Sequence, residues 1–194
     1  MTWLPLPATA ASRDPFERVF ILRANLFEAW RDFSALFWTR RLLDPVLLEL
    51  CRLRVAQLLG ARYPQSVRTP EALAAGLSEG RIAALSAWWT SDDFGESERA
   101  CLRFAEQFVL DAKGITDAEA AAVVGALGDA GTVAFVEALA IFDGFSRFCC
   151  SLDVGASRRR RRAASGARSE PKASGVHETC RRRAKAGSRK DGRP

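Results

Sequence analysis

The stretch that decides the fold runs from Glu49 to Glu71 and reads ELCRLRVAQLLGARYPQSVRTPE. Its first part is mostly apolar and ends at Gly60, which is the pattern of a buried helix that stops at a glycine. A short polar turn follows. Thr69-Pro70-Glu71 is then typical of a helix start, because proline fits the first helical turn. The stretch therefore predicts two helices joined by a turn.

Helical spacing continues on both sides of this stretch, to about residue 154. Thr116 with Glu119 three residues later fits a capping box, and we expect the helix that follows to end near Gly128 and the last helix to cover residues 132–152. Valine and isoleucine occur singly inside helical patterns rather than in alternating runs. We therefore predict an all-α, single-domain protein, and the other expected helix starts are Asp14-Pro15, Asp44-Pro45, Ser78 and Ser97.

The net charge of +6 hides two opposite parts of the chain. Residues 155–194 carry fourteen Lys or Arg against three acidic residues, whereas residues 1–154 carry fifteen against twenty. The basic part has almost no large apolar residue, so we expect a disordered tail, with contact to nucleic acid or an anionic surface only through its charge. A shifted reading frame in GC-rich DNA would encode the same composition. The high pI is therefore no evidence for a folded nucleic-acid-binding domain.

Histidine and cysteine usage excludes several kinds of active site. The only histidine, His177, lies in the basic tail, so the helical part cannot hold a Ser-His-Asp triad or a histidine-ligated metal. The five cysteines form no Cys-x-x-Cys pair, and we read them as reduced apolar side chains. We therefore expect no cofactor and no metal site. We also expect no membrane span, since no long apolar stretch lacks charges. The segment at residues 1–11 is a poor secretory signal, and we expect a cytoplasmic protein.

Several further motifs follow the turn in a fixed order. They are Gly76-Leu77-Ser78, Trp88-Trp89, Glu96-Ser97-Glu98-Arg99-Ala100, Ile115-Thr116-Asp117 and the closing Phe142-Asp-Gly-Phe145-Ser-Arg147-Phe148. Together with the turn, they resemble the alkylhydroperoxidase D-like (AhpD-like) or carboxymuconolactone decarboxylase family, from about Leu43 to Leu152. The resemblance implies an AhpD-like helical bundle at residues 43–154. The N-terminal helical extension expected at residues 1–42 and the tail at 155–194 lie outside the resemblance. The resemblance also implies homo-trimers or hexamers.

The resemblance places the site of the family in the turn, where redox members carry Cys-x-x-Cys followed by His. Here Ala61 and Pro64 stand at the cysteine positions, and Arg68 stands at the histidine position. A thiolate nucleophile is indispensable to the redox mechanism. Glu49 matches the glutamate that handles the proton in those members, and Tyr63 lies in the turn as in many relatives. We therefore predict a divergent member without thiol peroxidase chemistry.

The retained residues leave three arrangements open. Glu49 and Arg68 could form a fixed ion pair, since arginine stays protonated and cannot replace histidine as an acid-base group. Arg68 could instead point to solvent, or join Arg62 in holding a small anionic ligand near helix N-termini.

Two functional classes follow from these arrangements. The first is a non-catalytic or small-molecule-binding oligomer. The alternative is a non-thiol enzyme of decarboxylase or isomerase type, with Glu49 as acid-base and Arg68 holding an anionic substrate, Tyr63 completing the site. The sequence leaves enzyme and non-enzyme open.

Overall fold

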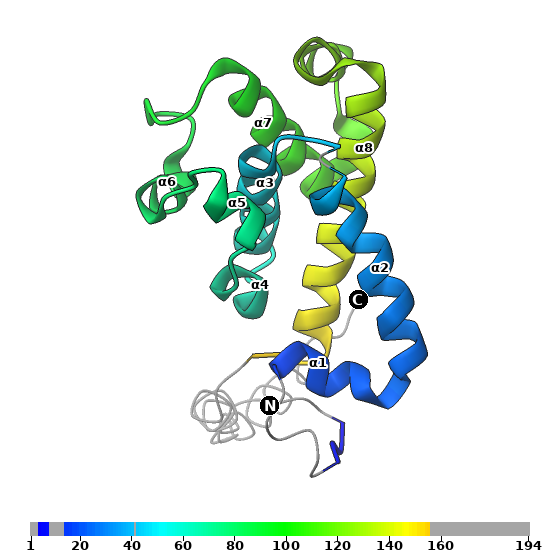
Figure 1. The fold of residues 1–194 in the computed structure, drawn as a ribbon. Helices are drawn as coiled ribbons and strands as arrows, with labels where there is room; N and C mark the ends of the chain where they lie inside the picture. Colours follow the sequence, from blue (N-terminus) through cyan, green and yellow to red (C-terminus); the bar gives the residue numbers. More distant parts are fainter. Residues whose placement is uncertain (1–3, 8–13, 41, 156–194) are drawn as a thin grey trace, which may run out of the picture. The chain divides into compact units, whose positions relative to one another are not determined.

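Every regular element in the described part of the chain is a helix. The computed structural model describes residues 4–7, 14–40 and 42–155, and its ribbon is shown in Figure 1. These residues belong to one unit spanning residues 1–157. The all-α prediction is therefore confirmed for this part of the chain, and the expected basic tail lies outside the described residues beyond position 155.

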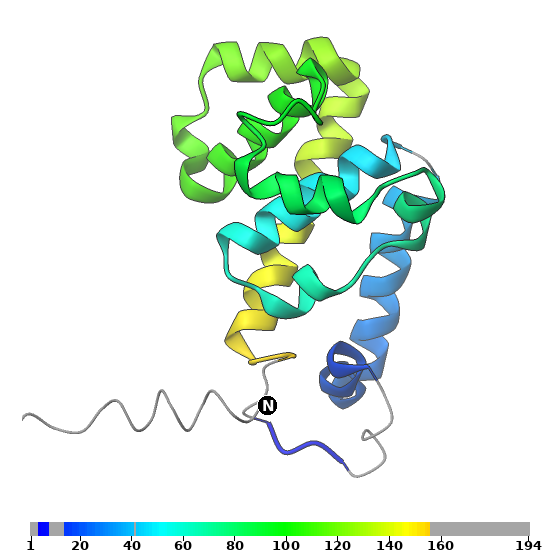
Figure 2. The same ribbon diagram turned by 90° about the vertical axis from the view of Figure 1, so that its left-hand side faces the viewer.

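Helix α3, Pro45–Leu58, forms the centre of the core. It begins as expected at Asp44, whose side chain accepts a hydrogen bond from the backbone N–H of Leu47 at 2.9 Å. Ten of its residues are buried, because α7 (Glu96–Asp111) and α8 (Asp117–Ser151) pack against it, as Figures 1 and 2 show. A helix buried on most sides has no need of a polar face, which explains its mostly apolar sequence.

The chain between α3 and α7 is a series of short helices. Gly60 has a φ of +64°, a conformation that favours glycine, and it ends α3 as expected. Beyond it lie α4 (Arg62–Ser66), α5 (Pro70–Ala74), α6 (Glu79–Ala84) and η3 (Leu85–Ala87). The helix expected after Ser78 is present as α6, with Ser78 as its N-cap, and α7 begins at Glu96 with Gly95 rather than Ser97 at its N-cap.

The N-terminal helices build a second, aromatic cluster. The chain runs through α1 (Pro15–Phe20), η2 (Ile21–Arg23) and α2 (Ala24–Thr39), with a break at Arg23, where the sequence shows uninterrupted helical spacing. Phe16 and Phe20 pack against aromatic rings of α2 and of the C-terminal part of α8. This packing joins the first helices to the last one.

Helix α8 contains a sharp internal break at Gly128, with φ 69° and ψ 173°. The two expected helices are therefore both present, on either side of this residue. Thr116 caps the first, since its hydroxyl accepts from the N–H of Glu119, after the short η4 turn at Ala112–Gly114. Among the described helices, α8 alone has the length and apolar composition to cross a membrane. That is weak evidence, because it rests on length and composition alone. Phe135 and Leu139 of α8 are fully buried in the protein core.

Candidate functional site

The side chain of Glu49 lies fully buried on α3, and its partner is on the same helix. Arg52 donates from Nε to Oε2 at 2.7 Å and from Nη2 to Oε1 at 2.6 Å. This is the two-point contact that the flat guanidinium makes with a carboxylate. Residues three apart share a helix face, so the backbone of α3 brings the two groups together.

A second residue also binds both oxygens of Glu49. Thr69, the N-cap of α5, donates from its hydroxyl to Oε2 at 2.6 Å and from its backbone N–H to Oε1 at 3.2 Å. Each carboxylate oxygen therefore accepts two hydrogen bonds from within the protein. A buried carboxylate bound in this way fixes the start of α5 against α3.

The remaining donors of Arg52 hold the turn itself. Its Nη1 donates to the carbonyl oxygen of Pro64 and its Nη2 to that of Val67, both at 2.8 Å. Arg52 is only 7% exposed, so these bonds form away from bulk water. The residues Glu49, Arg52 and Thr69, with these two carbonyls, form what we call the turn clamp. It occupies the region where the family resemblance places the redox site.

Arg68 does not pair with Glu49, and the hypothesis of a fixed Glu49–Arg68 ion pair is wrong. Arg68 instead bonds Glu79, with Nε–Oε1 at 2.8 Å and Nη2–Oε2 at 3.1 Å, and donates to the carbonyl of Gln65 at 2.6 Å. The hydrogen bond to Glu79 raises the pKa of Arg68. The physical reason for the difference is proximity. Arg52 lies one helical turn from Glu49 and donates to both of its carboxylate oxygens.

Tyr63 makes a structural contact rather than facing the turn clamp. Its hydroxyl donates to Oδ1 of Asp14 at 2.6 Å, and the same oxygen accepts from the N–H of Phe16 at the start of α1. Burial, followed by the hydrogen bond to the Asp14 carboxylate, raises the pKa of Tyr63 well above its usual range. The phenol is thereby held in its protonated form and ties α4 to α1.

No described cysteine is an activated thiol. Ala61 and Pro64, at the motif positions, are both buried and carry no reactive atom. Burial raises the pKa of Cys51 strongly, that of Cys101 to about 11 and that of Cys149 to about 12. A reactive cysteine needs a lowered pKa, so these side chains have the opposite character.

A second polar cluster was missed by the sequence analysis. Oε1 of Glu106 accepts from Nε of Arg54 at 2.5 Å and from the indole N–H of Trp88 at 2.7 Å. Arg54 and Glu106 are 52 residues apart, so no local spacing signals their contact. The turn clamp did leave such a signal, in the three-residue spacing of Glu49 and Arg52.

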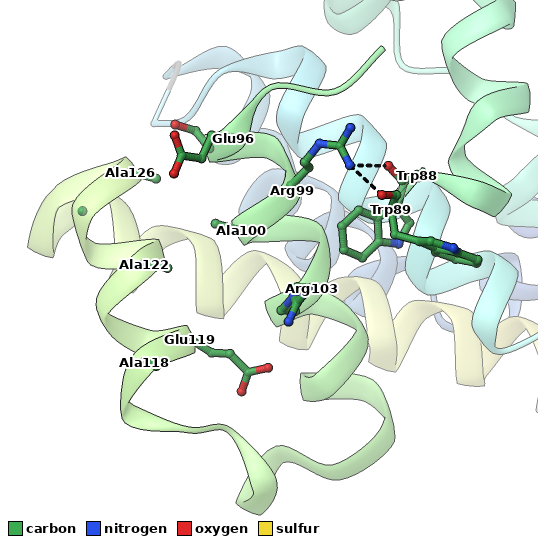
Figure 3. Close-up of a pocket in the computed structure, with 12 residues that line it drawn as sticks. Trp88, Trp89, Glu96, Arg99, Ala100, Arg103, Ala118, Glu119, Ala122 and Ala126 are labelled. Carbon is green, nitrogen blue, oxygen red and sulfur yellow. Dashed lines mark hydrogen bonds between the residues drawn. The ribbon is translucent and has the colours of Figure 1, made fainter. Parts of the chain in front are cut away.

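The structure also contains an open groove between α7 and the first half of α8, with a volume of about 640 Å³ (Figure 3). None of Glu49, Tyr63 and Arg68 lines it. Its walls are formed by two tryptophans, four charged residues and a set of small residues, namely Trp88, Trp89, Glu96, Arg99, Arg103, Glu119, Ser97, Ala100, Ala118, Ala122, Gly125 and Ala126. The structure thus separates the expected site residues from this groove.

Comparison with known proteins agrees with this architecture. Residues 24–107 match the carboxymuconolactone decarboxylase family, a match that begins within α2 and includes the whole turn clamp. No curated protein matches the chain at a significant level.

A solved structure shows the same fold. It is protein ATU0492 from Agrobacterium tumefaciens, described as of unknown function with a suggested identity as the antioxidant defence protein AhpD. It superposes with a TM-score of 0.63 at 20% identity, covering 70% of this chain and 92% of that one. Residues 24–107 of the chain therefore match the carboxymuconolactone decarboxylase family, and the chain has the same fold as this AhpD-like protein.

Proposed function

We propose that this protein is a non-catalytic or small-molecule-binding oligomeric member of its family, without thiol peroxidase chemistry. The observation that carries the proposal is the state of the Glu49 carboxylate. Both of its oxygens are engaged by Arg52 and Thr69, and the residue is fully buried. A general base must reach the proton it removes, and here every approach is taken by a donor of the protein itself.

The alternative, a non-thiol decarboxylase or isomerase with Glu49 as acid-base, needs two rearrangements. Glu49 would have to leave Arg52, and Arg68 would have to leave Glu79 to hold an anionic substrate. Releasing Glu49 leaves a buried charge without its partner, which costs about 3–5 kcal/mol. The non-catalytic function requires neither step, and we prefer it for this reason.

The oligomeric part of the proposal is supported by the outer face of α2. Leu26, Phe33 and Leu36 are 57%, 46% and 40% exposed, and with the exposed Ala29 they recur at spacings of three and four residues. Such a stripe is the pattern of a helix that packs against another helix. We propose that a second copy of the chain covers it.

The self-association can be tested on the intact protein by light scattering after gel filtration. Replacing Leu26 and Phe33 together by Glu is expected to reduce the molar mass to that of one chain. The matched control is Ala24→Glu, which adds a charge at an exposed residue on the other side of the same helix and is expected to leave the mass unchanged. An oligomer unaffected by the double replacement would place the interface elsewhere.

The absence of thiol chemistry is tested by peroxide and disulfide turnover. The unmodified protein is compared with a double variant, Ala61→Cys with Pro64→Cys, in which the carbonyl at position 64 remains available to Arg52. We expect no turnover by the unmodified protein. Turnover that disappears on replacing Cys51 would overturn the proposal, whereas activity gained only by the double variant would show that the surrounding framework still supports the reaction.

A further inference from the structure

The groove between α7 and α8 differs from the turn clamp because it contains hydrogen-bond donors that have no acceptor among the described residues. Arg103 projects from α7 and makes no hydrogen bond or ion pair with any described residue. In Figure 3 it lies between the two tryptophans and the alanines of α8. An arginine offers five donors in one plane, so this side chain is free to bind a carboxylate at two points.

Two of the other charged residues of the groove, Arg99 and Glu119, are already hydrogen-bonded within the protein. Arg99 donates to the carbonyl oxygens of Phe94 and Trp89, both at 2.9 Å, of Trp88 at 3.1 Å, and of Ser91. Its charge therefore supports the loop before α7 and meets only neutral oxygens. Neither Arg99 nor Arg103 is hydrogen-bonded to a carboxylate of the described residues.

The two acidic residues have a different compensation. Glu96 and Glu119 both lie in the first turn of a helix, where the helix dipole favours negative charge. Oε2 of Glu119 also accepts two hydrogen bonds from Thr116, and these bonds, with the charge of Arg103 as the smallest cause, lower the pKa of Glu119. Among the cations of the groove, Arg103 is therefore the one without a hydrogen-bonded partner among the described residues.

The walls indicate the shape of a ligand. Trp89 is 53% exposed, although its neighbour Trp88 is buried. Apart from Glu119, the wall formed by α8 consists of alanines and Gly125, which present little beyond their backbones. A flat apolar body fits between an indole face and such a wall, and a groove of about 640 Å³ falls in the range of small-molecule sites.

We propose that the α7–α8 groove binds a planar apolar carboxylate, with the carboxylate on Arg103 and the ring against Trp89. This deepens the proposed function by naming the site and class of a bound ligand. The proposal rests on the proposed function in one respect, namely that the protein binds the ligand without converting it. The site is distinct from the turn clamp, where the family resemblance places the redox site.

Titration calorimetry on the full chain tests the site, with 2-naphthoate as the probe. We expect one molecule bound per chain, and Arg103→Met is expected to weaken binding roughly tenfold or more, as loss of a charged hydrogen bond does. Arg31→Met, at another exposed arginine, on α2, is the matched control and should leave Kd unchanged. Glu119→Gln keeps the capping box and removes a competing charge, so it should tighten binding.

Other outcomes would overturn the site. These are no binding of 2-naphthoate to the natively folded protein, equal binding of 2-naphthalenemethanol, which has the ring without the carboxylate, or an Arg103→Met variant with unchanged Kd. Circular dichroism of each variant confirms that the helices are retained. Because binding and peroxide turnover are measured separately, failure of the groove and failure of the proposed function give different results.

Discussion

The guanidinium of Arg52 lies edge to edge with the carboxylate of Glu49, with N–O distances of 2.7 and 2.6 Å, and bonds two carbonyl oxygens of the following turn. One side chain thus holds a buried acid and the backbone that would carry a catalytic motif. The acid in turn holds Thr69 at the start of α5. The arrangement joins α3, the turn and α5 through charge-assisted hydrogen bonds, which are the stronger kind.

Replacing Arg68 by alanine is expected to change the stability little. Its partner Glu79 is exposed, and exposed ion pairs contribute little because water competes for both groups. Urea unfolding followed by circular dichroism measures the effect, with Glu79→Gln as the control for the pair. A large drop in the urea midpoint for Arg68→Ala alone would mean that Arg68 has a buried role that the structure does not show.

Tyr63 can be followed directly, because it is the only tyrosine in the sequence. Burial and the Asp14 carboxylate raise its pKa, so tyrosinate absorbance at 295 nm should not appear near pH 10, the usual value for tyrosine. Asp14→Asn removes the charge and should lower the pKa of Tyr63. Half-ionisation at or below pH 10 in the folded protein would contradict the contact.

Buried thiols should make the protein less stable in alkali. The pKa of Cys101 is about 11 and that of Cys149 about 12 in the folded state, above the value near 8.5 of an exposed thiol. Between these values the unfolded chain loses protons that the folded chain keeps, so the free energy of unfolding falls as pH rises. The contribution is fully present below about pH 8.5 and declines above it.

Urea midpoints measured between pH 8 and 10.5 check this dependence. Cys101→Ala should show a shallower decline than the unmodified protein, whatever its stability at neutral pH. Arg31→Gln, on the exposed ion pair with Asp32, is a control that should keep the slope. A midpoint that stays constant over this range would show that the thiols ionise equally in both states.

Two glycines of α8 should respond oppositely to alanine. Gly128 has a positive φ, so a side chain there strains the backbone, and Gly128→Ala should cost about 1–2 kcal/mol although no atom lies within 4 Å of the added methyl group. Gly144 lies within regular helix with equally open space, and Gly144→Ala should stabilise by about 0.5–1 kcal/mol. Similar effects at both positions would contradict the break at Gly128.

Local signals account for what the sequence predicted of the fold. Asp14, Asp44 and Thr116 each cap a helix through their own side chains, and Gly60 and Gly128 adopt the backbone that ends one. These features depend on residues a few positions apart in the sequence, so they can be predicted without knowing how the helices pack. The start of α7 could not be predicted in this way. Its N-cap residue is Gly95, which has no side chain, and the backbone N–H of Gly95 donates to the carboxylate of Glu98.

The candidate site was predicted only in part. The region and Glu49 were identified through the family resemblance, but the partner was assigned to Arg68, by motif position, when Arg52 was closer along the same helix. The contacts of Tyr63 with Asp14 and of Arg54 with Glu106 span 49 and 52 residues. Such contacts depend on how the helices pack, which no local pattern specifies.

The most direct measurement of the central claim is a double-mutant cycle on Glu49 and Arg52, using the free energy of unfolding in urea. Arg52→Met alone leaves a buried charge and should cost about 3–5 kcal/mol. Arg52→Met with Glu49→Gln should cost about 1–3 kcal/mol less than the sum of the two single replacements, because the two groups are coupled. Additive single effects would contradict the turn clamp and make Glu49 available for chemistry.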